Sequence, residues 1–383
     1  TKKFHCLRQF FFYAMMGHRL ELDDVHTKSK THIGTVVVPA AWSLSEYLHK
    51  TGKEFLEAVI SGYETMSRIG MGFGVSSHRN KGWHVTATAG TFGAAAAAAK
   101  LLKLDEDKTV SALGMAGTQS FGLWAFLNDG ASCKILHPAR AAASGTEAAL
   151  LSYSGMTGPE HILDAKDGGL YAAMSDEYDL NLVSKDLGKK YELMDMDNKP
   201  YPCCRSTHCA IDAALAIRKD NKLSAGDIDH VEIKTYLVGY KQCGVSGGSL
   251  NPVTPVDAKF STPYTVACAF VYGKVALDQF KQAKIGNPEV QELLRKVKVF
   301  PEERFTNVYP NHWGCTIKVW CKNGKILEKD VSDASGSVAN PLTEEQVVEK
   351  ARNLMTINHH PSNNPELIKV IMQMDKIQEL PQL

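Results

Sequence analysis

The sequence predicts a mostly α-helical protein in which a helical domain is interrupted by a smaller α/β unit. Between residues 36 and 160, apolar residues recur three and four positions apart, which is the spacing of an amphipathic helix. Alternation of apolar and polar residues, typical of a half-buried strand, occurs only after about residue 195. The helical spacing returns after Pro341. We therefore expect a helical domain of residues 1–195 and 341–383, and an α/β lid domain of residues 196–340.

The helical part contains five segments with this spacing. The strongest is Thr86–Leu104, because its six consecutive alanines have the best helix propensity and their small side chains allow close helix packing. In addition to these five, a shorter apolar stretch at Leu7–Met16 is half-helical in pattern. The other predicted helices are Pro39–Lys50, Lys53–Ile69, Val110–Gly122 and Pro138–Gly155.

The α/β unit combines strands and helices. His230–Leu237 alternates with period two, and Asn323-Gly324 is a preferred turn dipeptide of a two-residue β-hairpin. Thr343 and Gln346 have the spacing of a capping box and open a final helix. The remaining predicted elements are the hairpin strands Cys315–Cys321 and Ile326–Val331, the helices Ser206–Lys219, Tyr264–Leu277 and Val347–Met355, and a mobile loop at Gly244–Pro255.

The composition is that of an ordinary globular chain with balanced charge. The 383 residues include 43 Lys and Arg against 42 Asp and Glu, a formal net charge of +1. This balance gives no basic footprint for nucleic acid, and no apolar run approaches the ~20 residues of a membrane-spanning helix. Nine cysteines without regular spacing indicate reduced thiols. We expect a cytoplasmic protein, with the mitochondrial matrix as the alternative, and neither a nucleic-acid nor a membrane partner.

The polar segment from His18 to His32 is the first candidate for chemistry. It carries Glu21, Asp23 and Asp24 between histidines. These residue types suit a metal site, acid–base chemistry in which carboxylates hold an imidazole in one tautomer, or a solvated loop with helix caps. The His-x5-His and Asp-Asp spacings match no standard zinc or calcium motif, and we predict no metal. The other two interpretations stay open on this segment alone.

Two later segments place histidines and cations at helix starts. His84 precedes the alanine helix, whose first amides favour an anion, although a cap or a core position is the alternative. Lys134, His137 and Arg140 lie at the entry to the helix Pro138–Gly155. Because cations at a helix start oppose the macrodipole, we expect a bound carboxylate or a structural Asp to offset them.

The segment Lys199–His208 combines cations, a histidine and two thiols before a predicted helix. Its adjacent Cys203 and Cys204 do not have the spacing of an iron–sulfur ligand set, which argues against an iron–sulfur dehydratase. The sequence also has no G-x-G-x-x-G after a strand, no P-loop and no G-x-S-x-G elbow. Nucleotide chemistry and serine hydrolysis are therefore not expected.

Together these segments resemble the MmgE/PrpD family, which includes 2-methylcitrate dehydratase, cis-aconitate decarboxylase and iminodisuccinate epimerase. The matching stretches occur in the family's order: HRLELDDVH…TH (18–32), GWHVTATAGTFGAAAAAAKLLKLD (82–105), KILHPARAAASG (134–145), KPYPCCRSTHCAIDAA (199–214), AKFSTPYTVACA (258–269) and NPLTEEQVVEKARNL (340–354). The resemblance implies a helical domain completed by C-terminal helices, an active-site cleft under an α/β lid, no metal or other cofactor, and a homodimer.

The resemblance also implies roles for residues that match the family one by one. His32, His84 and Lys134 match catalytic positions. Arg140 is a further candidate for a carboxylate clamp, on its position alone. The residues expected to bind the substrate or to orient the histidines are Glu21, Asp23, Asp24, Lys199, Cys204, His208 and Tyr264.

Three positions depart from the family's pattern. Glu21 stands where we expect Asp, Cys204 stands where the decarboxylase has its lid histidine, and Tyr264 lies one residue before the expected tyrosine. The family also carries some tens of helical residues ahead of the HRLELDD segment. Because the sequence starts at Thr1 without an initiator Met, we expect a fragment or a trimmed chain.

We predict a cofactor-independent lyase that dehydrates a hydroxy-tricarboxylate such as 2-methylcitrate. Elimination of water needs a base for the carbon-bound proton, cations beside the reacting carboxylate, and an acid for the departing hydroxide. His84 or His32 would supply the base and the acid, and Lys134 and Lys199 would clamp carboxylates. The alternatives are decarboxylation of cis-aconitate, epimerisation of an amino-dicarboxylate, and an inactive structural member that lacks the upstream segment.

Overall fold

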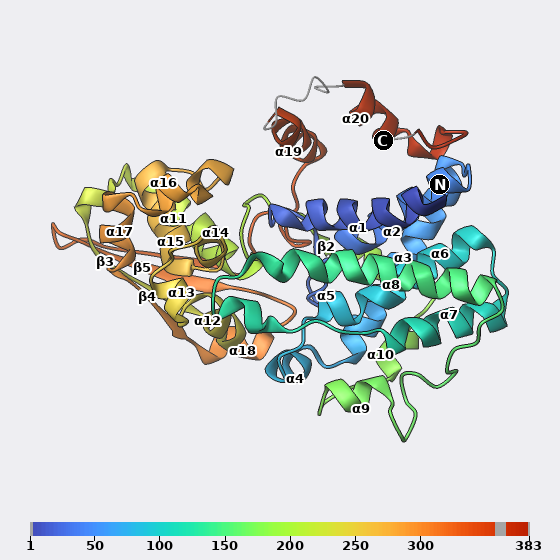
Figure 1. Ribbon diagram of the computed structural model, residues 1–383. Helices are drawn as coiled ribbons and strands as arrows, with labels where there is room; N and C mark the ends of the chain where they lie inside the picture. The colour runs from blue at the N-terminus through green and yellow to red at the C-terminus, as the bar shows by residue number, and fades with distance from the viewer. Residues whose placement is uncertain (1–2, 357–364, 382–383) are drawn as a thin grey trace.

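The computed structural model describes residues 3–356 and 365–381. Within them, the predicted mostly α-helical fold with a smaller sheet-containing part is confirmed (Figure 1). The helices of the first part are α1 Lys3–Arg19, α2 Gly34–Tyr47, α3 Gly52–Gly72, α4 Val75–Asn80, α5 Val85–Thr88, α6 Gly90–Leu102, α7 Glu106–Thr118, α8 Leu136–Tyr153, α9 Leu170–Met174 and α10 Asn181–Ser184. Short 3-10 turns lie at η1 Trp124–Leu127, η2 Ser132–Ile135 and η3 Glu192–Asp195.

All five helical segments predicted for this part are present, with shifted ends. α2 begins at Gly34, ahead of the predicted Pro39, which lies inside the helix. α3 begins after Thr51, which forms a capping box with Glu54. The predicted alanine helix is divided at Ala89 into α5 and α6. Helical spacing therefore located the elements, while the caps and the packing decided where each one begins.

Small residues allow the helices of this part to pack closely. α6 lies against both α3 and α8, and its alanines, Ala94 to Ala99, are all buried. A Cβ atom on Gly145 of α8 would overlap the backbone carbonyl oxygen of Thr91 in α6. Among the described residues one window, Val85–Leu102, is long and apolar enough to cross a membrane, and 89% of it is buried inside the protein. That burial is typical of a core helix.

Replacing Gly145 with alanine is expected to lower the free energy of unfolding by about 1–3 kcal/mol, because the new methyl group overpacks the contact between α6 and α8. The change runs against helix propensity, by which alanine in place of glycine gains roughly 1 kcal/mol. Urea unfolding measures the difference. Gly247→Ala is the matched control, since a Cβ there meets nothing within 4 Å. Equal stability of the two variants would contradict the close approach.

The second part contains a four-stranded sheet with the strand order β4-β3-β5-β6. β3 and β4 are parallel, and the other neighbouring strands are antiparallel. The strands are β3 Ile228–Thr235, β4 Val297–Pro301, β5 Cys315–Cys321 and β6 Ile326–Val331. The helices and turns are η4 Arg205–Thr207, α11 His208–Asn221, η5 Ala225–Asp227, α12 Leu237–Cys243, α13 Gly247–Leu250, α14 Pro255–Lys259, α15 Thr262–Tyr272, η6 Leu277–Phe280, α16 Gln282–Ile285, α17 Pro288–Leu294 and α18 Glu303–Val308. Residues of α11, α15 and the sheet form a buried core separate from that of the first part.

The β5–β6 hairpin has its predicted strands but a different turn. The backbone N–H of Cys321 donates to the carbonyl oxygen of Lys325 at 2.8 Å, so the loop contains three residues rather than two. Gly324 has a φ of +84°. A left-handed glycine in the third loop position is the usual solution for a three-residue hairpin loop.

Two other predictions for this part are corrected. The helix predicted over Tyr264–Leu277 ends at Tyr272, because Gly273 has a φ of +67° and terminates it. The loop predicted at Gly244–Pro255 contains the short helix α13, whose first turn is capped by the Ser246 hydroxyl. Glycine and serine acted there as helix-start residues rather than as signals for a structureless loop.

Contacts distant in the sequence join the two parts beside the loop that follows α1. β1 Val25–His26 pairs antiparallel with β2 Met196–Asp197. Lys259 Nζ of the second part donates to the backbone carbonyl of Leu20 at 3.1 Å. We propose, from the two separate cores, that the predicted boundaries at 195/196 and 340/341 divide the chain into two folding units.

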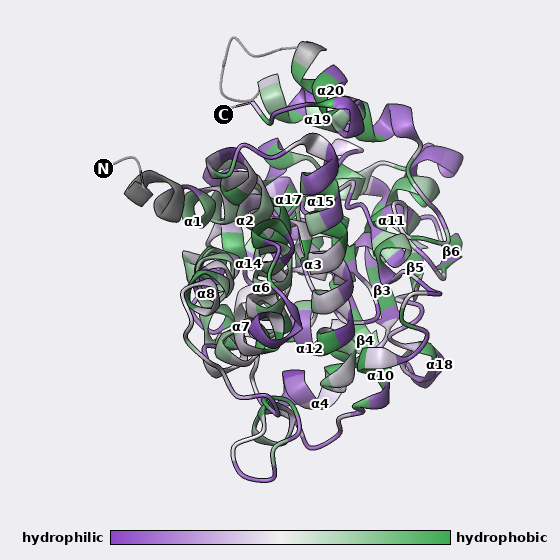
Figure 2. Cartoon of the chain, turned by 90° about the vertical axis from the view of Figure 1, so that its right-hand side faces the viewer, coloured by the Kyte–Doolittle hydropathy of each residue, from purple (hydrophilic) through white to green (hydrophobic). Residues whose placement is uncertain are grey.

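The C-terminal helices α19 Glu344–Thr356 and α20 Pro365–Met372 lie along one edge of the molecule in both ribbon views (Figures 1 and 2). The predicted capping box is confirmed, since the Thr343 N–H donates to Gln346 at 2.8 Å and the Gln346 N–H donates to the Thr343 hydroxyl at 3.3 Å. After the turn η7 Met374–Lys376, Leu380 packs into the core of the first part.

Candidate active site

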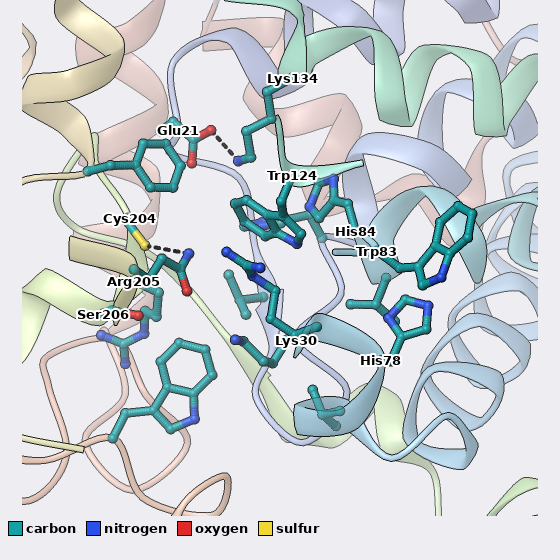
Figure 3. Close-up of a pocket in the computed structure, with 18 residues that line it drawn as sticks. Glu21, Lys30, His78, Trp83, His84, Trp124, Lys134, Cys204, Arg205 and Ser206 are labelled. Atoms are coloured by element: carbon teal, nitrogen blue, oxygen red, sulfur yellow. Dashed lines mark hydrogen bonds and ion pairs between the residues drawn. The ribbon is translucent and has the colours of Figure 1, made fainter. Parts of the chain in front are cut away.

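A pocket lies between the two parts of the protein (Figure 3). One wall comes from the loop after α1, from α4 and from the turns that precede α8. The opposite wall comes from residues 204–206, Gln242, Phe260 and Trp313 of the α/β part. Concave sites where separate units meet are preferred places for small ligands.

Glu21 forms the charged centre of one end of the pocket. Its carboxylate accepts a hydrogen bond from Lys134 Nζ, and Lys199 Nζ lies 3.4 Å from its other oxygen. Burial alone would raise the pKa of Glu21, but the two ammonium groups outweigh burial and hold the pKa far below its usual range. Both lysines, which we predicted as clamps for substrate carboxylates, are thus already paired within the protein.

Asp23 holds two imidazoles. Its Oδ2 lies 2.7 Å from Nδ1 of His18 and 2.9 Å from Nδ1 of His32, and its Oδ1 lies 3.7 Å from Lys199 Nζ. Burial raises the pKa of Asp23, but His18, Lys199 and His32 together hold it well below its usual range. An ionised Asp23 with these contacts has the geometry that its predicted orienting role requires.

The contacts of His32 fix its tautomer. Nδ1 faces two acceptors, Asp23 Oδ2 and, at 3.0 Å, the backbone carbonyl oxygen of Asp24, so Nδ1 carries the hydrogen. Burial lowers the pKa of His32 to about 4, although Asp23 raises it. The ring is therefore neutral at pH 7, and its Nε2 atom is free to accept a proton.

We expect His32 to titrate near pH 4 rather than near the 6.5 of an unperturbed imidazole. Because a histidine is protonated below its pKa, the base is lost only as the pH falls through about 4. Proton NMR of the protein labelled at histidine measures the midpoint, and the His32→Gln spectrum identifies the resonance. Asp23→Asn should move the midpoint lower still, since Asp23 favours the protonated ring. A midpoint of 6 or above would refute the buried, neutral base.

His84 and His137 form an imidazole pair beside the pocket. Their Nδ1 atoms lie 2.7 Å apart, so one ring donates a hydrogen and the other accepts it. Burial lowers the pKa of His137 to about 4 and lowers that of His84 well below its usual value, where His137 and Lys134 add to the effect. Both rings are therefore neutral at pH 7. In the tautomer in which His137 holds the hydrogen between the two Nδ1 atoms, neutral His84 carries its own hydrogen on Nε2 and can donate it; in the other tautomer Nε2 of His84 is an acceptor.

Cys204 brings an ionisable thiol from the α/β part. It lines the pocket, and Gln242 Nε2 donates to its Sγ at 3.3 Å. Burial raises the pKa of the thiol, but hydrogen bonds from Cys243 and from the backbone of Ser206 outweigh burial and lower it to about 6. The position that the resemblance gives to the decarboxylase's histidine is thus held by another group that can exchange a proton near neutral pH.

Two further cations, Lys30 and Arg79, line the pocket. Lys30 Nζ lies 5.6 Å from the centre of the Tyr309 ring and 5.8 Å from that of Trp313. The Arg79 guanidinium carbon lies 4.4 Å from the centre of the Trp124 ring. Burial, together with Arg79, lowers the pKa of Lys30 to about 8. Lys30 remains largely protonated at pH 7.

Arg140 and Tyr264, which we predicted to bind the substrate, lie away from the pocket. Arg140 is exposed on α8, whose neighbouring Ala139 and Ala141 face the core. The hydroxyl of Tyr264 donates to the backbone carbonyl of Gln279 inside the core of the α/β part. The position of Arg140 on α8 directs its side chain to solvent, and a buried hydrogen bond holds the side chain of Tyr264.

His208 and Asp24, which we predicted to bind the substrate or to orient the histidines, have side chains that are engaged outside the pocket, although the Asp24 carbonyl oxygen contacts His32. His208 is buried at the start of α11 and packs against Tyr201 with a ring-centre distance of 5.1 Å. Asp24 accepts hydrogen bonds from the Tyr63 hydroxyl at 2.6 Å and from the Gly34 N–H at 2.9 Å. Neither residue lines the pocket. Burial raises the pKa of Asp24 more than its hydrogen bonds lower it.

The fold brings to the site several residues to which the sequence assigned no role of their own. These residues are His18, Lys30, Arg79, Trp124 and His137. His18 and Lys30 lie in the polar segment that was selected, and His137 lies three residues after Lys134, so their neighbourhood was visible in the sequence. The positions of Arg79 and Trp124 depend on how α4 and η1 pack, which no local pattern records.

His18, Asp23 and His32 offer three ligand atoms within 4.8 Å of one another, as a metal site would. Both imidazole Nδ1 atoms, however, lie at hydrogen-bond distance from the same carboxylate oxygen. An ammonium group, Lys199 Nζ, lies 3.7 Å from the other oxygen. A cation there would have to displace these hydrogens and face a positive charge, so the arrangement fits a hydrogen-bonded network better than a metal centre.

The pocket between the helical part and the α/β part holds buried imidazoles, a carboxylate and ammonium groups, which are the side chains of acid–base chemistry. The model of the MmgE/PrpD N-terminal domain matches residues 2–183, and that of the MmgE/PrpD C-terminal domain matches residues 201–375. The chain belongs to the MmgE/PrpD family, as the resemblance predicted.

Three of its curated relatives carry the name cis-aconitate decarboxylase or a name derived from it. A cis-aconitate decarboxylase-like protein of Aspergillus oryzae, oryM, is 28% identical over 88% of this chain and 72% of its own length. The cis-aconitate decarboxylase of Aspergillus terreus is 26% identical over 94% of this chain and 76% of its own. The human cis-aconitate decarboxylase is 28% identical over 96% and 76%, respectively.

Proposed function

We propose that this protein is a lyase that acts on a small tricarboxylate through a carbanion stabilised by a neighbouring carboxylate. The observation that carries the proposal is the charge of the pocket. Four cations, Lys30, Arg79, Lys134 and Arg205, line it together with one carboxylate, Glu21. Arg205 is paired with Asp197 at 3.0 Å, and Lys134 is paired with Glu21. The charges of Lys30 and Arg79 are therefore the ones that favour a polyanionic ligand.

The neutral imidazoles supply the proton transfers that such chemistry needs. In a decarboxylation, the carbon–carbon bond to one carboxylate breaks, carbon dioxide leaves, and the electron pair stays on the remaining carbon. That carbon then takes a proton from a general acid. His84 can donate this proton from Nε2 when His137 holds the hydrogen shared between their Nδ1 atoms. That hydrogen then passes to Nδ1 of His84, and the half-buried His137 takes a replacement proton from solvent at Nε2, so that both rings end neutral. The cations lower the free energy of the negative charge that spreads onto the adjacent carboxylate.

Decarboxylation of cis-aconitate is the first candidate reaction. It is supported by the names of the relatives, which align over at least 88% of this chain in the three described above. Identities of 26–28% do not by themselves carry a substrate across. The chemistry of the pocket is consistent with this reaction through Lys134, His84 and His32.

Dehydration of 2-methylcitrate, the reaction predicted from the sequence, is the second candidate. The observation that favours it is Cys204, which departs from the histidine expected of a decarboxylase. In a dehydration, a base removes a carbon-bound proton, the carbon–oxygen bond breaks, and the departing hydroxide takes a proton to leave as water. His32, with Nε2 unprotonated, suits the base, and His84 suits the acid.

The protein is incubated separately with cis-aconitate, 2-methylcitrate and citrate, and proton NMR of each mixture identifies the product, which distinguishes the candidates. Release of labelled carbon dioxide from cis-aconitate would support decarboxylation, and an alkene product from 2-methylcitrate would support dehydration. The same panel includes iminodisuccinate in deuterated water, because deuterium in recovered substrate without net loss would indicate an epimerase instead. No turnover of any acid, with no rise of the unfolding temperature in their presence, would refute the proposal and favour an inactive member.

A further inference from the structure

Lys30 and Arg79 are half-buried in the pocket and have no ion-pair partner among the described residues. Lys30 Nζ is inaccessible to solvent and has no hydrogen-bond partner. In the part of the chain that the structure describes, no carboxylate lies within ion-pair distance of either side chain. The charge that acts most strongly on Lys30 is Arg79, which is of the same sign. A buried cation without a partner is unfavourable unless a ligand completes it.

Other described groups of the protein do not pair directly with Lys30 or Arg79. The three ion pairs at the Glu21 end of the pocket are closed among Glu21, Asp23, Lys134 and Lys199. The ionisable thiol of Cys204 raises the pKa of Lys30 and of Arg79 by its charge, but it is bound by Gln242 and makes no hydrogen bond with Lys30. The rings of Tyr309 and Trp313 offer their faces to Lys30, which offsets part of its burial but leaves no anion.

The backbone conformation of Lys30 is also unusual. Lys30 has a φ of +58°, in the left-handed region that side-chain-bearing residues rarely adopt. Glu21, at the other end of the same loop, has a φ of +59°. Figure 3 shows Lys30 on the opposite side of the pocket from Glu21 and Lys134. Backbone strain of this kind concentrates at ligand sites, where the surrounding structure maintains it.

We propose that Lys30 and Arg79 form a second anion-binding subsite of the pocket, which holds a substrate carboxylate remote from the reacting carbon. The inference deepens the proposed function and rests on it for the identity of the substrate. Trp124 connects the two ends, because its ring lies 4.8 Å from that of His84 and 4.4 Å from the Arg79 guanidinium carbon. A ligand that reaches from His84 to Lys30 must carry anionic groups at both ends, which selects di- and tricarboxylates over monocarboxylates.

Calorimetric titration with citrate and with cis-aconitate tests the subsite without requiring turnover. Lys30→Met and Arg79→Met are each expected to weaken binding at least about tenfold, the loss typical of a charge-assisted hydrogen bond. Lys30→Arg keeps the charge and should recover most of the affinity. Lys53→Met, an exposed lysine of α3, is the matched control and should bind both acids as the unmodified protein does.

The unfolding temperature without ligand provides the second measurement. Because Lys30→Met removes an unpaired buried charge, it should leave that temperature unchanged or raise it while affinity falls. A lower unfolding temperature with unchanged affinity for both acids would overturn the proposal and make Lys30 structural. Inorganic phosphate is titrated as a third ligand. If Lys30→Met lost phosphate binding but bound both acids as the unmodified protein does, that result would overturn the proposal as well. Weakened binding of the acids by Lys30→Met, in a protein that turns over none of them, would sustain the subsite while the proposed reaction fails.

Discussion

Replacing Lys134 with methionine is expected to abolish turnover and to lower the free energy of unfolding by about 3–5 kcal/mol, the usual cost of removing one partner of a buried ion pair. The buried carboxylate of Glu21 would keep only Lys199 at 3.4 Å and His18 at 3.8 Å. The pocket would also lose one of its cations beside the imidazoles. Guanidinium unfolding and the turnover assay measure the two losses.

A double variant separates the two roles of Lys134. Glu21→Gln together with Lys134→Met removes both charges, so we expect most of the stability to return while turnover stays absent. Lys100→Met is the control, because its ion pair with Glu57 spans 3.7 Å at the surface and is worth about 1 kcal/mol or less. If Lys134→Met were as stable and active as this control, the buried pair would not have the role given to it here.

Replacing His84 with glutamine is expected to lower turnover roughly 100- to 10,000-fold, the range for loss of a general acid or base. The ring of His84 is buried, and its Nδ1 atom lies 2.7 Å from Nδ1 of His137. Whether Nε2 of His84 carries a hydrogen therefore depends on the tautomer of His137. His137→Phe should therefore reduce turnover less than His84→Gln and change its pH profile, because the shared hydrogen is lost while His84 remains. Steady-state kinetics between pH 5 and 9 measure both effects.

His208→Gln is the matched control for His84→Gln. Both histidines are buried, and burial lowers the pKa of each well below its usual value, but only His84 lines the pocket. We expect the His208 variant to keep its turnover and to lose only stability. Equal loss of turnover in the two variants would show that the effect comes from disturbed packing rather than from chemistry.

The periodic parts of the fold were predictable because a helix or strand that buries one face repeats its apolar residues at a fixed spacing. Helical spacing located α3, α7 and α8, and alternation located β3 and both strands of the hairpin. The ends were less predictable. Gly273 ends α15 before the apolar pattern stops, and Ala89 separates α5 from α6 within one uniform apolar run.

The site was predictable as a set of segments and not as a set of contacts. Residue types drew attention to the loop after α1, to His84 and to Lys134, and the fold brings these three together. Arg140 and Tyr264 were predicted to join them, but Arg140 is exposed and Tyr264 is fixed in a separate core. Whether a side chain of a selected segment points into a pocket depends on packing between elements that are far apart in the sequence.

The sequence by itself determined the mostly α-helical class, the interruption by an α/β part and the membership of the MmgE/PrpD family, because periodicity and motif order are local properties of the chain. Only the tertiary structure decided the charge state of the site. Glu21 meets Lys134 and Lys199 across more than one hundred residues, and that contact leaves Lys30 and Arg79 as the unpaired cations of the pocket. Protonation and pairing depend on burial and on distances between groups remote in the sequence, and only the folded chain sets these.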